Sequence, residues 1–168
     1  SKGLGAPVGS VVCGTQDFIN EARRARKVLG GGMRQAGVIA AAGIVALKEM
    51  VDRLADDHAN AKKLATGLAE IPGISIDPEQ IPTNIVFFEV NHEDMTPAEF
   101  VQRIDAEGIR MLVVPAGPNT VRAVTHYHIT SEDIDLGLSR LVSDRRNEPE
   151  IYLSGYTSSE QKVIIDLA

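Results

Sequence analysis

A nearly continuous helical pattern from Met33 to Ile71 constrains this chain more than any other feature of its sequence. Its first part is rich in alanine. Small side chains on a helix let a neighbouring segment approach closely, so we expect that part to be buried in a core or in a subunit interface. Its second part, from Asp52 onward, carries more charges, and Pro72 and Gly73 end the pattern. The sequence therefore predicts a long helix, with a domain boundary somewhere in residues 52–72.

Beyond this helix the sequence alternates between strand and helix patterns. Short apolar or alternating runs bounded by turn residues predict strands, and such runs occur at residues 74–76, 84–90, 111–114 and 121–128. Strands separated by helical segments in a layer this small predict helices packed on one face of a mostly antiparallel sheet. The expected fold class is therefore α/β.

Two helices in this part of the chain carry clear start signals. Thr96, Pro97 and Glu99 form the pattern of a capping box with proline at the first helical position. Thr130 or Ser131 predicts the start of a final helix, whose first turn contains acidic residues that complement the helix dipole. The segment before the long helix predicts a short buried strand, 10–13, and a helix from about residue 15 to 29 that stops at three consecutive glycines.

Composition and charge argue against several classes of protein. The hydrophobic content of 43% and the charged content of 24% are typical of a globular chain that can bury a core. A net charge of -6 opposes sequence-independent binding of nucleic acid, which needs a basic surface. The single cysteine, Cys13, excludes an internal disulfide and favours a reducing compartment such as the cytoplasm. The apolar run 38–47 is too short to span a membrane.

The first ten residues, SKGLGAPVGS, combine one lysine with three glycines. Their third glycine follows three residues rather than two, so they do not form the GxGxxG fingerprint of a dinucleotide-binding loop. A lysine beside glycines is normally a surface residue in a turn. By pattern alone, Lys2 is therefore not assigned a function.

The same ten residues match, residue for residue, the segment around the cofactor lysine of the L-threonine aldolases. These are pyridoxal 5'-phosphate (PLP) dependent enzymes of fold type I, and the chain resembles the C-terminal half of their low-specificity members. The resemblance implies that Lys2 holds PLP covalently. A lysine in this role needs an environment that leaves it partly deprotonated, and the flanking glycines let the cofactor approach the backbone closely.

A second stretch, RKVLGGGMRQAG at residues 26–37, also resembles the family. Taken alone, it is a glycine-rich break between helices with a cation at each margin. Lys27 complements the helix dipole in the last turn of one helix. Arg34 is expected in the first turn of the next helix, where a cation is unfavourable unless an anion lies nearby. The resemblance implies that Lys27 and Arg34 contact the cofactor phosphate of a neighbouring subunit.

A third stretch, VRAVTH at residues 121–126, places Arg122 inside a strand with apolar neighbours. A buried arginine needs an anionic partner, and pattern alone leaves two partners open: an acidic side chain of the chain itself, or a ligand. In the family that it resembles, the arginine of the R-x-V-T-H motif binds the α-carboxylate of the substrate, which suits a planar bidentate group. The resemblance therefore favours substrate binding by Arg122.

His126 and His128 are expected on one face of that strand and could be interpreted as a pair of metal ligands. No third ligand occurs at a suitable spacing. We therefore interpret both histidines as structural or hydrogen-bonding residues, and no metal site is predicted.

The resemblance covers about residues 1–141 and implies the C-terminal part of a fold-type I PLP enzyme. Residues 1–60 would end the large PLP-binding domain with the connecting helix, 61–142 would form the small α/β domain, and 143–168 would be a tail of unknown role. The implied reaction is retro-aldol cleavage of L-threonine or L-allo-threonine to glycine and an aldehyde. Other residues of the family's site precede the lysine, so we expect this polypeptide alone to be inactive.

The implied assembly is a cytoplasmic homo-oligomer, a dimer or homotetramer with shared active sites, that acts on a small amino acid and binds neither nucleic acid nor membranes. Two alternatives stay open. Another fold-type I enzyme, such as a β-eliminating lyase, would share the scaffold. A non-catalytic fragment could oligomerise through its alanine-rich helix.

Overall fold

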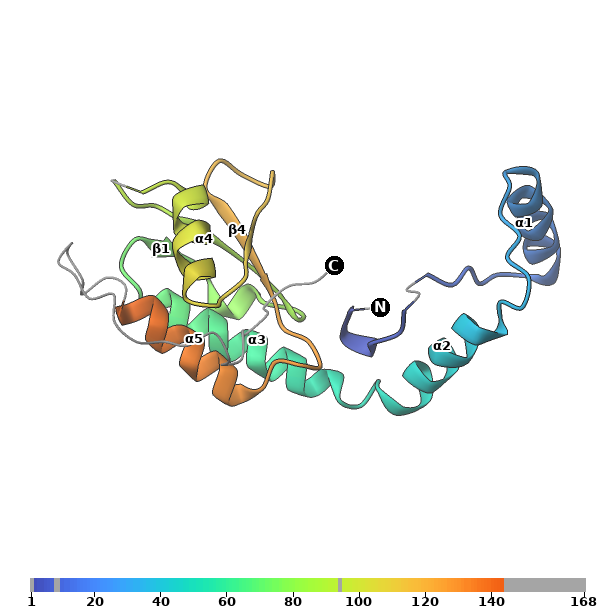
Figure 1. Cartoon of the computed structure of the whole chain (residues 1–168), viewed down its shortest axis with the longest axis horizontal. Helices are drawn as coiled ribbons and strands as arrows, with labels where there is room; N and C mark the ends of the chain where they lie inside the picture. The colour runs from blue at the N-terminus through green and yellow to red at the C-terminus, as the bar shows by residue number, and fades with distance from the viewer. Residues whose placement is uncertain (1, 8–9, 94, 144–168) are drawn as a thin grey trace. The chain divides into compact units, whose positions relative to one another are not determined.

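The computed structural model describes residues 2–7, 10–93 and 95–143 (Figure 1), and the chain divides into two compact units. The first unit ends at Asp52 and the second begins at Arg53. Within the described ranges, every helix is too short or too polar to cross a membrane. The assignment of the two units to the large and small domains of a PLP enzyme stays a prediction, and the tail 144–168 lies outside the described residues.

The first unit contains a short 3-10 helix, η1 (Lys2–Leu4), and the helices α1 (Gln16–Val28) and α2 (Gly37–Glu49). Helix α1 begins as predicted, because the Thr15 side chain accepts a hydrogen bond from the Phe18 N–H. The predicted strand 10–13 is wrong. A strand needs a hydrogen-bonded neighbour, the described part of this unit offers none, and Val11 is 80% exposed.

Glycine ends α1 as the sequence predicts. Gly30 has a φ of +85°, in the left-handed region that glycine adopts without strain. Its N–H donates to the Lys27 carbonyl at 3.2 Å, and the Gly31 N–H donates to the Arg26 carbonyl at 2.8 Å. These two bonds form a Schellman motif, which satisfies carbonyls that the end of a helix would otherwise leave open.

The single long helix predicted from residue 33 to 71 is wrong, because it is two helices. Helix α2 ends at Glu49, and α3 (Leu54–Ala69) begins after a break at residues 50–53. Asp56 and Asp57 lie in the first turn of α3. Negative charges there favour a helix N-terminus over a helix interior, so the charged part of the pattern favours a new start.

The second unit is an antiparallel sheet of four strands with helices on one face (Figure 1). The strands follow the spatial order β1-β2-β4-β3, which places β4 inside the sheet. The predicted α/β layer with a mostly antiparallel sheet is thereby confirmed. The strands are β1 (Ile74–Ser75), β2 (Ile85–Val90), β3 (Leu112–Val113) and β4 (Thr120–Val124).

The helices of this unit are α3, α4 (Pro97–Ala106) and α5 (Ser131–Ser143), with a short 3-10 helix, η2 (Pro78–Gln80), after β1. Both predicted start signals are confirmed. Thr96 and Glu99 form the full capping box of α4. At α5, the Thr130 N–H donates to Asp133 Oδ2 at 2.9 Å and the Asp133 N–H donates to Thr130 Oγ1 at 3.2 Å.

The core lies between the sheet and these helices. Val86 and Phe88 of β2 and Val121 and Ala123 of β4 are buried and point to the helical side. Since side chains alternate along a strand, the residues between them point to the opposite face of the sheet. The core is completed by side chains of the helices and of the loop after α4, among them Leu64, Leu68, Phe100, Ile104, Ile109 and Ile134.

Candidate functional site

Arg122 occupies the middle of β4, on the face of the sheet that the helices do not cover. Its cross-strand neighbours are Phe87 of β2 and Leu112 of β3, and these are 49% and 45% exposed. The Nε atom of Arg122 is buried. Apolar neighbours displace water from around a cation and thereby strengthen its interaction with an anion. The position suits an arginine that binds a carboxylate.

A pocket of mixed polarity lies beside the β2 neighbour of this arginine. Phe87, the cross-strand neighbour of Arg122, lines a pocket of about 470 Å³. The rest of the wall comes from the segment between β1 and β2 and from the start of β2. It has an apolar part, Ile76, Ile81, Pro82 and Ile85, and a polar part, Asp77, Gln80 and Thr83. Arg122 does not line this pocket itself, but its neighbour Phe87 does, so an amino acid whose carboxylate reached the arginine could direct its side chain toward it.

The end of β4 is held by a buried network that the sequence patterns do not reveal. Thr125 is fully buried, and its Oγ1 donates to the Asp57 carbonyl at 2.6 Å. Its N–H donates to the Asn84 carbonyl at 3.0 Å, and its carbonyl accepts from Asn84 Nδ2 at 2.7 Å. The backbone just after Arg122 is thus joined both to the start of β2 and to the first turn of α3.

Helix α3 holds the following turn as well. The carboxylate of Asp57, which is fully buried, pairs with Arg53 one helical turn earlier. The Arg53 guanidinium lies over the Tyr127 ring, 5.0 Å from its centroid. Asn60 Nδ2 donates to the Ile129 carbonyl at 2.9 Å. The N-cap residue of α3, Arg53, and two residues of its first two turns therefore contact or bond the segment 125–129.

Lys2, Lys27 and Arg34 belong to the first unit, and Arg122 belongs to the second. Lys2 begins η1, followed by Gly5 with a φ of +69°. Lys27 is in the last turn of α1 as expected, and its side chain folds back over the glycines: a Cβ on Gly32 would lie 3.2 Å from its Nζ. Both Lys27 and Arg34 are exposed and form no ion pair with the described residues.

The prediction that Arg34 lies in the first turn of a helix is wrong. Helix α2 begins at Gly37, because Gln35 adopts a left-handed φ of 46° that interrupts the helical path. Arg34 lies in the turn that precedes the helix. The electrostatic argument from an unfavourable helix dipole therefore does not apply to it.

The two histidines do not share a strand face, because β4 ends at Val124. His126 and His128 flank Tyr127 in the turn that follows, with ring centroids 5.8 Å apart. The His128 N–H donates to His126 Nδ1 at 3.3 Å. Among the residues that the structure describes, no group of three histidine, cysteine or acidic side chains could hold a metal ion.

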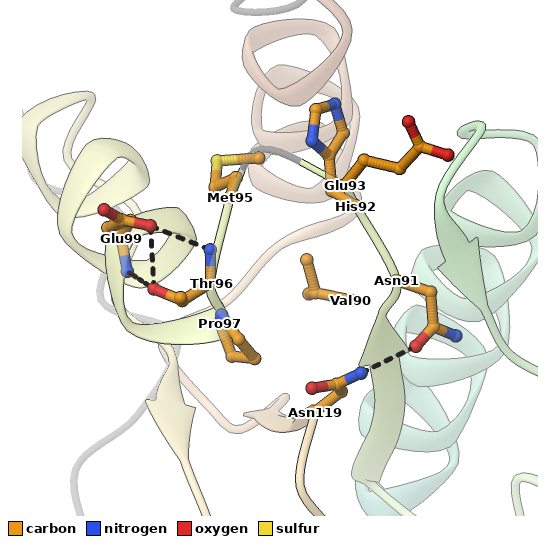
Figure 2. A pocket seen from close by; sticks show the side chains of 9 residues that line it. All are labelled: Val90, Asn91, His92, Glu93, Met95, Thr96, Pro97, Glu99 and Asn119. Carbon is orange, nitrogen blue, oxygen red and sulfur yellow. Dashed lines mark hydrogen bonds between the residues drawn. The ribbon is translucent and has the colours of Figure 1, made fainter.

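A further pocket of about 580 Å³ lies between the end of β2 and the start of α4 (Figure 2). Four of its polar residues are engaged in local structure: Asn119 Nδ2 donates to Asn91 Oδ1 at 2.9 Å, and Thr96 and Glu99 cap α4. The bonds from the backbone and then the side chain of Thr96 hold the pKa of Glu99 below its ordinary value. None of the predicted site residues lines this pocket.

Comparisons with known proteins agree with the predicted family. The model of the beta-eliminating lyase family matches residues 1–91. The chain is 43% identical over 140 residues to the low-specificity L-threonine aldolase 1 of Arabidopsis thaliana, covering 83% of this chain and 38% of that protein. It is 42% identical over 135 residues to the low specificity L-threonine aldolase of Escherichia coli, covering 80% and 38%. The chain thus spans less than half of the length of these relatives.

Solved structures support the fold. A PLP-dependent aminotransferase from Streptococcus suis matches 83% of this chain and 38% of its own, with a TM-score of 0.58 at 18% identity. The cystine C-S lyase C-DES matches 63% of this chain and 28% of its own, with a TM-score of 0.52 at 24% identity. The fold is therefore that of part of a fold-type I PLP enzyme. With the family model matching more than half of its residues, this chain belongs to the beta-eliminating lyase family.

Proposed function

We propose that the whole protein is a PLP-dependent aldolase that cleaves L-threonine and L-allo-threonine to glycine and an aldehyde. One observation carries the proposal: Arg122 stands between apolar neighbours on the uncovered face of the sheet, where a carboxylate can reach it. The names of relatives that are 42–43% identical to this chain support the same activity.

The residues of the first unit fit PLP by their chemistry. A lysine amine, as in Lys2, condenses with the aldehyde of the cofactor, and nearby glycines leave room for the ring. Lys27 and Arg34 are exposed cations that pair with none of the described acidic residues, so they are free to contact a phosphate. When bound, PLP supplies an electron sink for the breaking Cα–Cβ bond.

Arg122 would orient the amino-acid substrate. A guanidinium donates two parallel hydrogen bonds to a carboxylate, which fixes the plane of the amino acid as well as its position. The apolar side chains of Phe87 and Leu112, each about half exposed, shield this pair partly from water and so strengthen it. The side chain of the substrate would then lie toward the pocket lined by Phe87.

The assembly that we propose is a cytoplasmic homo-oligomer, a dimer or tetramer, in which Lys27 and Arg34 reach the cofactor phosphate of a neighbour. Helix α2 supports this. Apart from Lys48 and Glu49 in its last turn, it is apolar on all sides, yet of its described side chains only Ala46 is buried within the chain. A helix that is apolar all round is normally buried, so we expect a neighbouring subunit to pack against α2. Light scattering of the PLP-loaded protein measures the oligomeric state.

The activity is tested with a panel of threonine, allo-threonine, serine and tyrosine. We expect glycine and acetaldehyde from the first two amino acids. Release of pyruvate and ammonia from serine or tyrosine, without glycine from threonine, would instead identify a β-eliminating lyase. Absence of a PLP absorbance band in a well-folded oligomer would favour a non-catalytic role.

Two variants test the residues. Lys2→Ala is expected to abolish the label that borohydride reduction attaches to the protein in the presence of PLP. The control is Lys63→Ala, which removes a lysine of α3 that forms an ion pair with Asp135, and it should keep the label. Arg122→Lys is expected to raise the KM for threonine by about 10-fold or more, because a lysine cannot form the bidentate pair. Arg110→Lys is the matched control, since Arg110 forms an exposed ion pair with Asp105 in the same unit. An equal effect of both arginine variants contradicts the proposal.

A further inference from the structure

The direction in which the Arg122 guanidinium points depends on the position of the β4 backbone. Phe87 and Leu112 fix the strand laterally, because both are its ladder partners at this position. The ladder stops two residues later, at Val124, and a turn at residues 126–128 follows. A strand that ends this close to a binding residue needs another constraint, since a misplacement of about 1 Å is enough to weaken a bidentate contact.

Thr125 supplies that constraint. All of its polar atoms are bonded within the described chain: the N–H and the carbonyl to Asn84, and Oγ1 to the Asp57 carbonyl. The side chain is completely buried and β-branched, so its χ1 angle has little freedom. The hydroxyl bond links the end of β4 to a helix 68 residues away in sequence.

Asp57, whose carbonyl accepts the hydrogen bond from Thr125, is itself held in place. Asp57 belongs to the first turn of α3, and its carboxylate is held by Arg53. Arg53 also stacks on Tyr127, two residues beyond Thr125. The hydroxyl of Thr125 therefore bonds to a carbonyl whose own residue is fixed, which is the condition for transmitting a position rather than merely satisfying a hydrogen bond.

We propose that Thr125 is a positioning residue for substrate binding: its hydroxyl, bonded to the Asp57 carbonyl, holds the end of β4 and thereby aims the Arg122 guanidinium at the carboxylate of the amino acid. The proposal rests on the proposed function, because it gives Arg122 the carboxylate role. Thr125 acts through Arg122 and does not touch the substrate.

The test is a double-mutant cycle in the PLP-loaded whole protein. Thr125→Val keeps the shape of the side chain and removes the hydroxyl. We expect it to raise the KM for threonine by about 5- to 10-fold, the value of one buried hydrogen bond, with kcat changed by less than about twofold. Thr125→Ser restores the hydroxyl and is expected to restore the KM. In an Arg122→Lys background, Thr125→Val should raise the KM no further.

Several results would overturn the proposal. One is a folded Thr125→Val protein with the wild-type KM, and another is an equal rise in KM in the wild-type and Arg122→Lys backgrounds, which indicates a general structural role. If Thr125→Val does not fold, Thr125→Cys, which replaces the hydroxyl by a weak hydrogen-bond donor, takes its place and is expected to raise the KM; an unchanged KM there also contradicts the proposal. A wild-type KM in Arg122→Lys alone refutes the carboxylate role itself, so the two failures are distinguishable.

Discussion

Replacement of Gly67 by alanine is predicted to destabilise the second unit, although alanine is the better helix former. Gly67 lies in α3 where Leu138 of α5 packs against it. A Cβ built on Gly67 would lie 2.4 Å, 2.7 Å and 3.1 Å from Cδ1, Cδ2 and Cγ of Leu138. Ordinary carbon contacts are about 3.5–4.0 Å. Rotation about χ2 moves the two Cδ atoms but leaves Cγ in place, so the whole side chain must shift.

The magnitude follows from two opposing contributions. Alanine is favoured over glycine within a helix by about 1 kcal/mol. Overpacking a filled core costs about 1–3 kcal/mol, and Leu138 also packs against the core cluster, so its displacement disturbs further contacts. We therefore place the cost in the upper half of that range. The expected net loss in the free energy of unfolding is about 1–2 kcal/mol.

Urea unfolding followed by circular dichroism measures this loss, with Gly137→Ala as the matched control. A Cβ on Gly137 of α5 meets no heavy atom within 4 Å in the described chain, so alanine there is expected to be neutral or stabilising. In a Leu138→Ala background, Gly67→Ala should become stabilising, because the clash is gone. A Gly67→Ala protein at least as stable as the wild type, or an equal loss in both backgrounds, would refute the reasoning.

Three further predictions concern hydrogen bonds and ion pairs. The pKa of Glu99 is lowered in the folded state by its bonds from Thr96, so its contribution is present above the unfolded value of 4.5 and is lost as the pH falls below it. Glu99→Gln should therefore destabilise the protein at neutral pH, and by progressively less as the pH falls below 4.5, as measured by urea unfolding across this range. Thr130→Ala removes the cap of α5 and should lower the free energy of unfolding by about 1 kcal/mol; Thr130→Ser, which keeps the cap, is its control. Arg53→Met leaves the buried Asp57 carboxylate without its cation and should cost about 3–5 kcal/mol. Asp57→Asn should lower the free energy of unfolding by less, because the Arg53 side chain that it leaves without this carboxylate is 18% exposed and reaches water. Urea unfolding measures both variants.

Features set by local chemistry could be predicted from the sequence. The capping boxes at Thr96 and Thr130 and the glycine end of α1 each depend on residues within one turn, so their patterns suffice. The break between α2 and α3 could not be predicted from the pattern, because helical periodicity continues through it and only the acidic first turn of α3 marks a new start.

Some residues of the candidate site could likewise be predicted from the sequence, and others could not. Arg122 stands out in the sequence because a charge among apolar strand residues is unusual. Thr125 does not, since its partner Asp57 is 68 residues away and no local pattern links them. The premature end of β4 has the same cause: Thr125 bonds to Asn84 and α3, and the chain then turns. The roles of Lys2, Lys27 and Arg34 derive from family resemblance and stay predictions.

The apolar frame of Arg122 also bears on solubility. Across three adjacent strands, Phe87, Arg122 and Leu112 form one row on a face that the helices of the unit leave uncovered. With an apolar residue in place of the arginine, the row would become a continuous exposed apolar surface, of the kind that promotes self-association of sheets. The charge of Arg122 therefore opposes self-association whenever this face is exposed to water, for example during folding. An aliphatic substitution at this position would confound lost binding with aggregation, whereas lysine keeps the charge and separates the two.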